Sequence, residues 1–145
     1  MKVVKKLLAP VLVVGLLLTS LVTLHNLKDT KKDNVFRIGI SQYITHKSLD
    51  ATRKGFIEEL KKEGYVDGKN IQIDFQNAQG EQRNLKNISK QLAEESDLVF
   101  AIATPSAQSL ANTTKSTPIV FSAVTDPLAA KLVKNLKEPG GNITG

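Results

Sequence analysis

Two short apolar segments, 98–103 and 118–124, constrain the fold of this 145-residue chain more than any other feature. Each is rich in apolar and β-branched residues and is bounded by turn-forming residues, which is typical of a strand buried on both faces of a sheet. The segment between them predicts a crossover helix, so the two strands should be parallel. Both strands then end at one edge of the sheet, marked by Thr104 and Thr125. Because open α/β sheets bind ligands beyond the carboxyl ends of their strands, we expect a site at this edge.

The chain from residue 35 onward repeats this alternation of strand and helix. Apolar periodicity predicts the remaining strands and helices as follows: strands over 35–41 and 71–75, helices over 48–63, 81–96 and 128–136, and a last strand that begins at Asn142. The second strand alternates apolar and polar residues like an edge strand, and Gly64 should end the first helix at its C′ position. Strict alternation predicts an α/β fold with a doubly wound parallel sheet of strand order 2-1-3-4-5.

The first 34 residues have a different character. Three lysines within residues 1–6 precede 18 uncharged residues, 7–24, which as a helix would be about 27 Å long. This pattern indicates a signal peptide or a signal anchor. The length of the apolar segment favours an uncleaved anchor over a cleaved leader. The three lysines and the terminal amine before it favour a cytoplasmic N-terminus and an exported domain. We therefore divide the chain into a leader or anchor helix, 1–24, a polar tether, 25–34, and an α/β lobe, 35–145.

Charge and composition exclude several classes of protein. The net charge is +6, but residues 1–34 contain six lysines and two aspartates, which leaves only +2 for the rest. A nucleic-acid-binding protein concentrates positive charge on its folded domain, so nucleic acid is not an expected partner. The chain has no cysteine and two histidines, which argues against a metal site and removes the cysteine nucleophile.

Motifs for common α/β enzymes are also missing from the sequence. Neither a dinucleotide-binding G-x-G-x-x-G, nor a phosphate-binding loop, nor a G-x-S-x-G elbow occurs. The expected strand ends carry Ser41-Gln42 and Ala103-Thr104 where a receiver domain would need acidic residues. The sequence therefore favours a binding protein without a cofactor over an enzyme.

Neutral polar residues at the expected strand ends are the candidate ligand-binding groups. Thr104 is placed to cap the helix after the third strand and Pro105 to occupy its first position, so the amides of Ser106 and Ala107 would attract a carboxylate or a phosphate, although most helices that start in this way bind nothing. Thr125 and Asp126 end the next strand in a similar way. Asp126 either receives an amine or only caps the following helix. An α-amino acid would satisfy both groups.

The loop after the first strand, 42–46, should lie at the same edge. Gln42 begins this loop, and Tyr43 offers a flat apolar ring with a polar tip, although a single tyrosine at the surface is more often simply packed. His46 either donates a hydrogen bond to a ligand or caps the helix beside Ser48. All of these groups are expected to face the edge at which the third and fourth strands end.

A resemblance to a known family rests on seven segments taken in order. They are RIGISQ at 37–42, HKSLD at 46–50, GF at 55–56, GYVDGKN at 64–70, AIATPSAQ at 101–108, PIVFSAVTDP at 118–127 and PGGNITG at 139–145. Together they resemble the start of ABC-transporter substrate-binding proteins of the tryptophan/tyrosine type. The resemblance covers about residues 36–145, while members of that family are about twice as long.

The resemblance implies one lobe of a two-lobed periplasmic-binding-protein fold. It implies that the ligand, an aromatic amino acid or a similar small polar solute, is held between the lobes and passed to a permease in the membrane. It also implies that 42–46, 104–107 and 125–126 are this lobe's share of the site. Two other functions stay open on the residues alone: a flavodoxin-like enzyme or signalling domain, and the ligand-sensing half of a transcription regulator.

Overall fold

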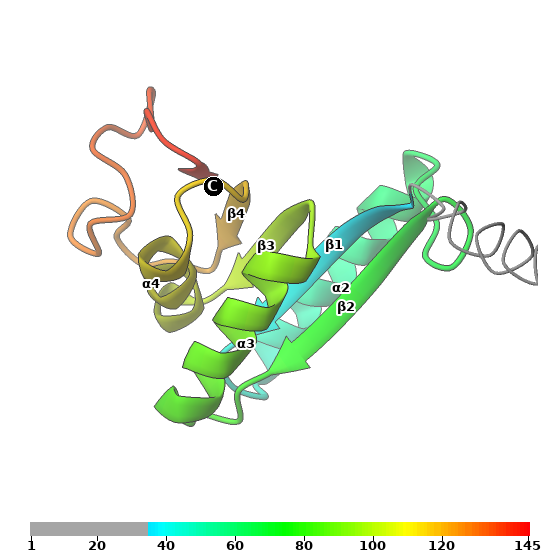
Figure 1. The fold of residues 1–145 in the computed structure, drawn as a ribbon, viewed down its shortest axis with the longest axis horizontal. Coiled ribbons are helices and arrows are strands. Elements are labelled where there is room, and N and C mark those ends of the chain that lie inside the picture. Colours follow the sequence, from blue (N-terminus) through cyan, green and yellow to red (C-terminus); the bar gives the residue numbers. More distant parts are fainter. Residues whose placement is uncertain (1–34) are drawn as a thin grey trace, which may run out of the picture. The chain divides into compact units, whose positions relative to one another are not determined.

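The computed structural model describes residues 35–145, which form a five-stranded sheet with helices on both faces (Figure 1). Its elements are β1 (Phe36–Gln42), α2 (Lys47–Lys62), β2 (Ile71–Asn77), α3 (Gln82–Glu95), β3 (Leu98–Ile102), α4 (Thr104–Thr113), β4 (Ile119–Ser122) and β5 (Ile143–Thr144). The alternation of strand and helix predicted from the apolar periodicity is confirmed up to β4.

All neighbouring strands are parallel and follow the order β2-β1-β3-β4-β5, which confirms the predicted topology. β1 lies between β2 and β3, with Ile40 in register with Phe75 on one side and Phe100 on the other. β2 is an edge strand, as its alternating pattern predicted. Parallel strands with crossover helices place every carboxyl end on one edge of the sheet.

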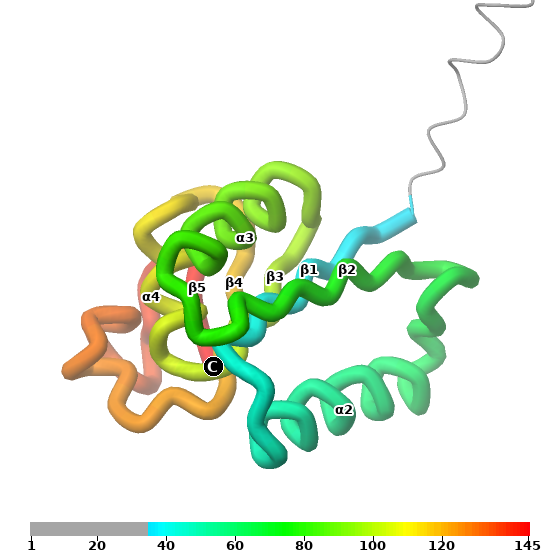
Figure 2. The backbone as a smooth tube through the Cα atoms, turned by 90° about the horizontal axis from the view of Figure 1, so that it is seen from below, coloured from blue at the N-terminus to red at the C-terminus, as the bar shows by residue number. Residues whose placement is uncertain are grey.

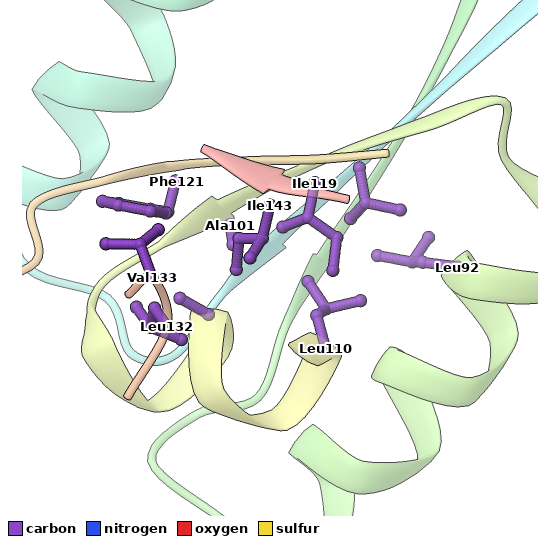
Figure 3. Close-up of a cluster of buried hydrophobic side chains, with 10 residues drawn as sticks. Leu92, Ala101, Leu110, Ile119, Phe121, Leu132, Val133 and Ile143 are labelled. Atoms are coloured by element: carbon purple, nitrogen blue, oxygen red, sulfur yellow. The ribbon is translucent and has the colours of Figure 1, made fainter. Parts of the chain in front are cut away.

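One face of the sheet packs against α3 and α4, and the other against α2 (Figure 2). The first face contains a cluster of buried apolar residues: Leu92, Val99, Ala101, Ala107, Leu110, Ile119, Phe121, Leu132, Val133 and Ile143. In Figure 3, Leu92 from α3 and Leu110 from α4 lie against the strand residue Ile119. Every second residue of β3 and β4 contributes to this cluster, as the two-residue period of a strand requires.

The face that packs against α2 is less completely covered. Ile38, Ile40, Phe100 and Ile102 are buried there, and the Phe56 ring of α2 stacks on Phe100 with 4.0 Å between ring centroids. Within residues 47–62, however, α2 buries none of its own residues. An apolar groove of about 300 Å³ remains beside it. α2 is therefore attached by half-buried contacts rather than by a closed core.

The ends of α2 have clear causes in the local sequence. The helix begins at Lys47, and its N-cap is His46, two residues before Ser48, the residue that the sequence offered as a cap. His46 Nδ1 accepts a hydrogen bond from the Ser48 amide. Gly64 has a φ of 89° at the C′ position, as predicted. The amides of Gly64 and Tyr65 donate to Lys61 and Leu60, which is the hydrogen-bond pattern of a Schellman motif.

The prediction of a helix over 128–136 was wrong. The segment makes a single turn, in which the Ala130 amide donates to the Asp126 carbonyl. Lys131 then adopts a left-handed φ of 57°, and the Lys131 and Leu132 amides donate back to Leu128 and Pro127. This is again a Schellman termination, which ends the helix after one turn. Leu132 and Val133 enter the core from an irregular segment instead.

Replacing Lys131 with glycine is expected to stabilise the domain by about 0.5–1 kcal/mol, because glycine adopts the left-handed conformation without the steric cost that a side chain adds. Urea unfolding measures the change. Lys134→Gly is the matched control, because Lys134 is an exposed lysine of the same segment and lacks a positive φ. That control should be neutral or slightly destabilising. A loss of stability in Lys131→Gly would contradict this account of the turn.

The predicted anchor helix and tether lie outside the described residues. Within 35–145, α2 has 16 residues, and no helix there is long and apolar enough to cross a membrane.

Candidate functional site

The candidate site lies where β1, β3 and β4 end. Gln42 is in register with Ile102, and Ile102 with Ser122, so the loops that follow these strands leave the sheet at one edge. The structure therefore places the three predicted segments, 42–46, 104–107 and 125–126, after three neighbouring strands. This arrangement follows directly from the strand order.

Buried polar atoms are concentrated at this edge. Among the residues that the structure describes, Ser41 Oγ, Gln42 Oε1 and Ser106 Oγ are buried without a hydrogen-bond partner, and all three residues are fully covered. An unsatisfied buried polar group costs about 1–3 kcal/mol. Such groups are uncommon in folded proteins and call for a physical reason. Two of these atoms lie at the end of β1 and the third lies in the first turn of α4, which follows β3. Arg53 Nε on α2 is the other such atom in residues 35–145.

Gln42 is held firmly by its own chain. Its Nε2 donates to the Ile44 carbonyl at 2.9 Å and to Asp50 Oδ1 at 2.8 Å. Ser41 points to the opposite face of the sheet, because successive strand residues alternate. The two residues thus bring hydrogen-bonding groups to both faces at the end of β1.

Tyr43 and His46 are both engaged within the lobe. The Tyr43 hydroxyl donates to the Gly80 carbonyl at 2.8 Å, and the ring is half-buried, so its tip joins the loop after β1 to the loop after β2. His46 Nδ1 lies 2.8 Å from Ser48 Oγ and caps α2. The sequence left two roles open for His46, a hydrogen bond to a ligand or a helix cap, and the structure shows the helix cap. Ile44, between them, is 42% exposed.

The start of α4 differs by one residue from the prediction. The N-cap is Ala103, not Thr104, and Pro105 is consequently the second helical residue rather than the first. Ala103 has φ 79° and ψ 155°, a conformation that is normally occupied by glycine and costs about 1–3 kcal/mol. Its amide donates to the Ser122 carbonyl, which ties the turn to β4. An alanine in this conformation gives no signal in the sequence.

Of the two amides that were expected to point outward, the Ala107 amide is engaged within the helix. The Ala107 amide donates to the Ala103 carbonyl at 3.2 Å, and both Ser106 and Ala107 are buried. The Ser106 side chain is thus a hydrogen-bonding group without a partner at the start of α4, whereas the Ala107 amide is not.

Asp126 and Thr125 are exposed at the end of the β4 segment. Asp126 Oδ1 accepts hydrogen bonds from the Leu128 and Ala129 amides, at 3.0 and 2.9 Å, and so caps the single turn that follows. Gln108 of α4 donates to the Ala130 carbonyl of this turn at 3.2 Å. The turn after β4 is therefore fastened to α4.

Sequence reasoning missed Ser41 and Asp50. Ser41 stands beside Gln42 at a strand end, which was a usable signal, but Asp50 lies eight residues from Gln42, and only the fold joins them. Within 35–145, no three His, Cys, Asp or Glu side chains gather closely enough to hold a metal ion.

Comparisons with known proteins agree with this architecture. The family model described as ABC transporter substrate binding protein matches residues 37–145. A curated protein from Clostridioides difficile (strain R20291), named tyrosine-binding protein, is 52% identical over 118 residues, which are 81% of this chain and 34% of that protein.

Two solved structures are similar as well. One is the ligand-free, open form of a substrate-binding protein with adhesive properties from Clostridium difficile, with a TM-score of 0.75 and 52% identity over 77% of this chain and 38% of that one. The other is an ABC domain in complex with L-Trp from Streptococcus pneumoniae, with a TM-score of 0.73 and 49% identity over 76% of this chain and 37% of that one.

The comparisons give no support to a flavodoxin-like enzyme or a regulator. The chain spans about a third of the length of the curated relative. With a family match over residues 37–145 and 52% identity to a curated relative, this chain belongs to the ABC transporter substrate-binding protein family.

Proposed function

We propose that residues 35–145 are the N-terminal lobe of the solute-binding component of an ABC importer, and that the solute is an aromatic amino acid or a similar small polar molecule. The named relatives support the solute class, because one is a tyrosine-binding protein and another is in complex with L-Trp. The family consists of binding proteins, and we extend this to a non-catalytic role for the present chain.

The observation that carries the proposal is the set of buried, unpartnered atoms at the carboxyl edge. Gln42 Oε1 has no partner and can accept a hydrogen bond from a solute, and the hydroxyls of Ser41 and Ser106 can donate or accept one. A small solute with both an ammonium and a carboxylate offers donors and acceptors to such a set. Recognition by a few fixed polar groups at a strand edge is typical of small-molecule sites.

These atoms are covered, so a solute reaches them only after a local shift. The exposed residues Ile44 and Thr45 belong to the loop that adjoins Gln42, and a displacement of this loop would open the edge. We assign to the site the residues Gln42, Tyr43, His46, Thr104, Pro105, Ser106, Ala107, Thr125 and Asp126, together with Ser41.

The partners follow from the family. Substrate-binding proteins of ABC importers are extracytoplasmic and deliver small solutes to a permease. For this chain we propose the same permease partner, with attachment to the membrane through the apolar segment 7–24, or secretion if that segment is cleaved.

The lobe alone is expected to bind an aromatic amino acid no tighter than millimolar. Micromolar affinity needs about 8 kcal/mol, whereas a net hydrogen bond contributes about 0.5–1.5 kcal/mol. A single lobe leaves the solute wet on its other side, and it is closure around a ligand that excludes this water. Titration of L-tryptophan into the ¹⁵N-labelled chain, followed by amide chemical shifts, measures the affinity and locates the site.

The expected result is a set of shift changes at 41–46, 104–107 and 125–126 that is far from saturation at low millimolar ligand. Acetate and ammonium ions together serve as the control for charge alone and should leave these residues unmoved. Shift changes confined to other parts of the lobe would contradict the site. Saturation at micromolar ligand would contradict the need for a second lobe.

A further inference from the structure

The orientation of the Gln42 amide is fixed by its surroundings. Both partners of Nε2, the Ile44 carbonyl and the Asp50 carboxylate, can only accept hydrogen bonds, because an ionised carboxylate and a backbone carbonyl have no proton to donate. The nitrogen must therefore face them. Both amide protons are used within the chain, and the carbonyl oxygen Oε1 is left as a buried acceptor without a partner.

Asp50 is itself held in place by α2 and β2. An Arg53 nitrogen lies 3.7 Å from Asp50 Oδ1, and the guanidinium carbon of Arg53 lies 4.0 Å from the centre of the Phe75 ring. Asp50 also lies in the first turn of α2, where the helix dipole favours a negative charge. The aspartate is thus anchored by its own helix and, through Arg53, by the edge strand.

We propose that Asp50 is a positioning residue for the ligand site: it binds the amide protons of Gln42, so that only the carbonyl oxygen remains for the ligand, and the site selects solutes that bring a hydrogen-bond donor there. For an amino acid this donor is the ammonium group. The inference rests on the proposed function. It assigns the amine to Gln42, while Asp126 Oδ1 is engaged as a turn cap.

Two variants separate positioning from a general effect on α2. Asp50→Asn retains a carbonyl oxygen that accepts from Gln42 but loses the charge that serves Arg53 and the helix dipole. Asp50→Ala loses both. Glu58→Ala is the control, because it removes an exposed carboxylate of the same helix that pairs only with Lys54, at 3.8 Å. All are compared in the full chain in a mild detergent, with folding checked by circular dichroism.

The first measurement needs no ligand. The side-chain amide signals of Gln42, identified by their loss in Gln42→Leu, should be distinct and slow to exchange in the unmodified chain, in Asp50→Asn and in Glu58→Ala. In Asp50→Ala one proton loses its acceptor, so exchange should become faster by at least tenfold. Unchanged Gln42 signals in Asp50→Ala would overturn the positioning role. If exchange of the Gln42 amide protons became equally fast in Asp50→Asn, the effect would come from the helix and not from the hydrogen bond.

The second measurement compares L-tryptophan with indole-3-propionate, which lacks only the amine. Hydrogen bonds to charged groups are strong enough for their loss to change affinity about tenfold or more. Asp50→Ala should therefore weaken L-tryptophan binding about tenfold, measured from the initial slopes of chemical-shift titrations, and the amine-free analogue by less than twofold. In Asp50→Asn, the preference for L-tryptophan over indole-3-propionate should be close to that of the unmodified chain.

The outcomes distinguish the two proposals. If L-tryptophan moves the carboxyl-edge signals but Asp50→Ala weakens both compounds equally, the proposed function stands and the selection of a donor by Gln42 is wrong. If neither compound moves these signals in the unmodified chain, both the proposed function and the selection of a donor by Gln42 are wrong for this chain, and the exchange measurement still decides whether Asp50 positions Gln42.

Discussion

Leu92→Ala is expected to lower the free energy of unfolding by about 2–5 kcal/mol, the range found when a large buried side chain is truncated in a core. Leu92 is 0% exposed and lies between α3 and the sheet, in the cluster with Val99, Leu110 and Ile119. The loss combines the removed apolar contact with the cavity that a rigid sheet cannot close. Urea unfolding monitored by circular dichroism measures it.

Leu136→Ala is the matched control, because it removes the same atoms from a leucine that is 64% exposed. Surface substitutions of this kind usually change stability by less than about 0.5 kcal/mol. A similar loss in both variants would mean that α3 does not pack on the sheet as described.

Gly39→Ala and Gly55→Ala should change stability in opposite directions. A Cβ on Gly39 would lie 2.6 Å from Ser96 Oγ and 3.1 Å from Leu92 Cδ2, so the helix α3 approaches β1 too closely for any side chain. Overpacking of this kind costs about 1–3 kcal/mol. A Cβ on Gly55 meets nothing within 4 Å. Because Gly55 lies inside α2, alanine there should add about 0.5–1 kcal/mol of stability.

A double variant tests the contact between Gly39 and Leu92 directly. Leu92→Ala removes the Cδ2 atom that opposes the new methyl group, so Gly39→Ala should cost less in that background than alone. Substitutions at residues in contact commonly deviate from additivity by about 0.5–3 kcal/mol. Strict additivity would mean that the contact with Ser96 Oγ at 2.6 Å, and not the contact with Leu92 Cδ2, causes the loss of stability.

The strand order was predictable because periodicity and connection rules leave few alternatives. The apolar runs at 98–103 and 118–124 required buried strands, and the alternating run at 71–75 required an edge. Gly64 correctly predicted the end of α2, because glycine is the usual residue for a left-handed C′ position. Lys131 occupies the same conformation without that signal, so the sequence suggested a full helix over 128–136 where the chain makes one turn.

The edge of the sheet that carries the candidate site was predictable, but the contacts of the residues there were not. Topology alone takes 42–46, 104–107 and 125–126 to one edge. The individual roles depend on hydrogen bonds between residues that no local pattern joins, such as Gln42 with Asp50 and Tyr43 with Gly80. The N-cap of α4 was misplaced by one residue, because the strained backbone of Ala103 is imposed by its bond to Ser122 and not by its side chain.

The shallow attachment of α2 has a thermodynamic consequence. The helix buries no residue within 47–62, yet it supplies the aspartate that steadies Gln42. By linkage, a solute that binds the Gln42 oxygen only while α2 is attached must raise the free energy of detaching this helix. A change that detaches the helix must in turn lower the affinity for the solute by the same factor. Substitutions that weaken the packing of α2 on the sheet, such as those at its partly buried residues Phe56 and Leu60, should therefore also weaken the binding of a solute at Gln42.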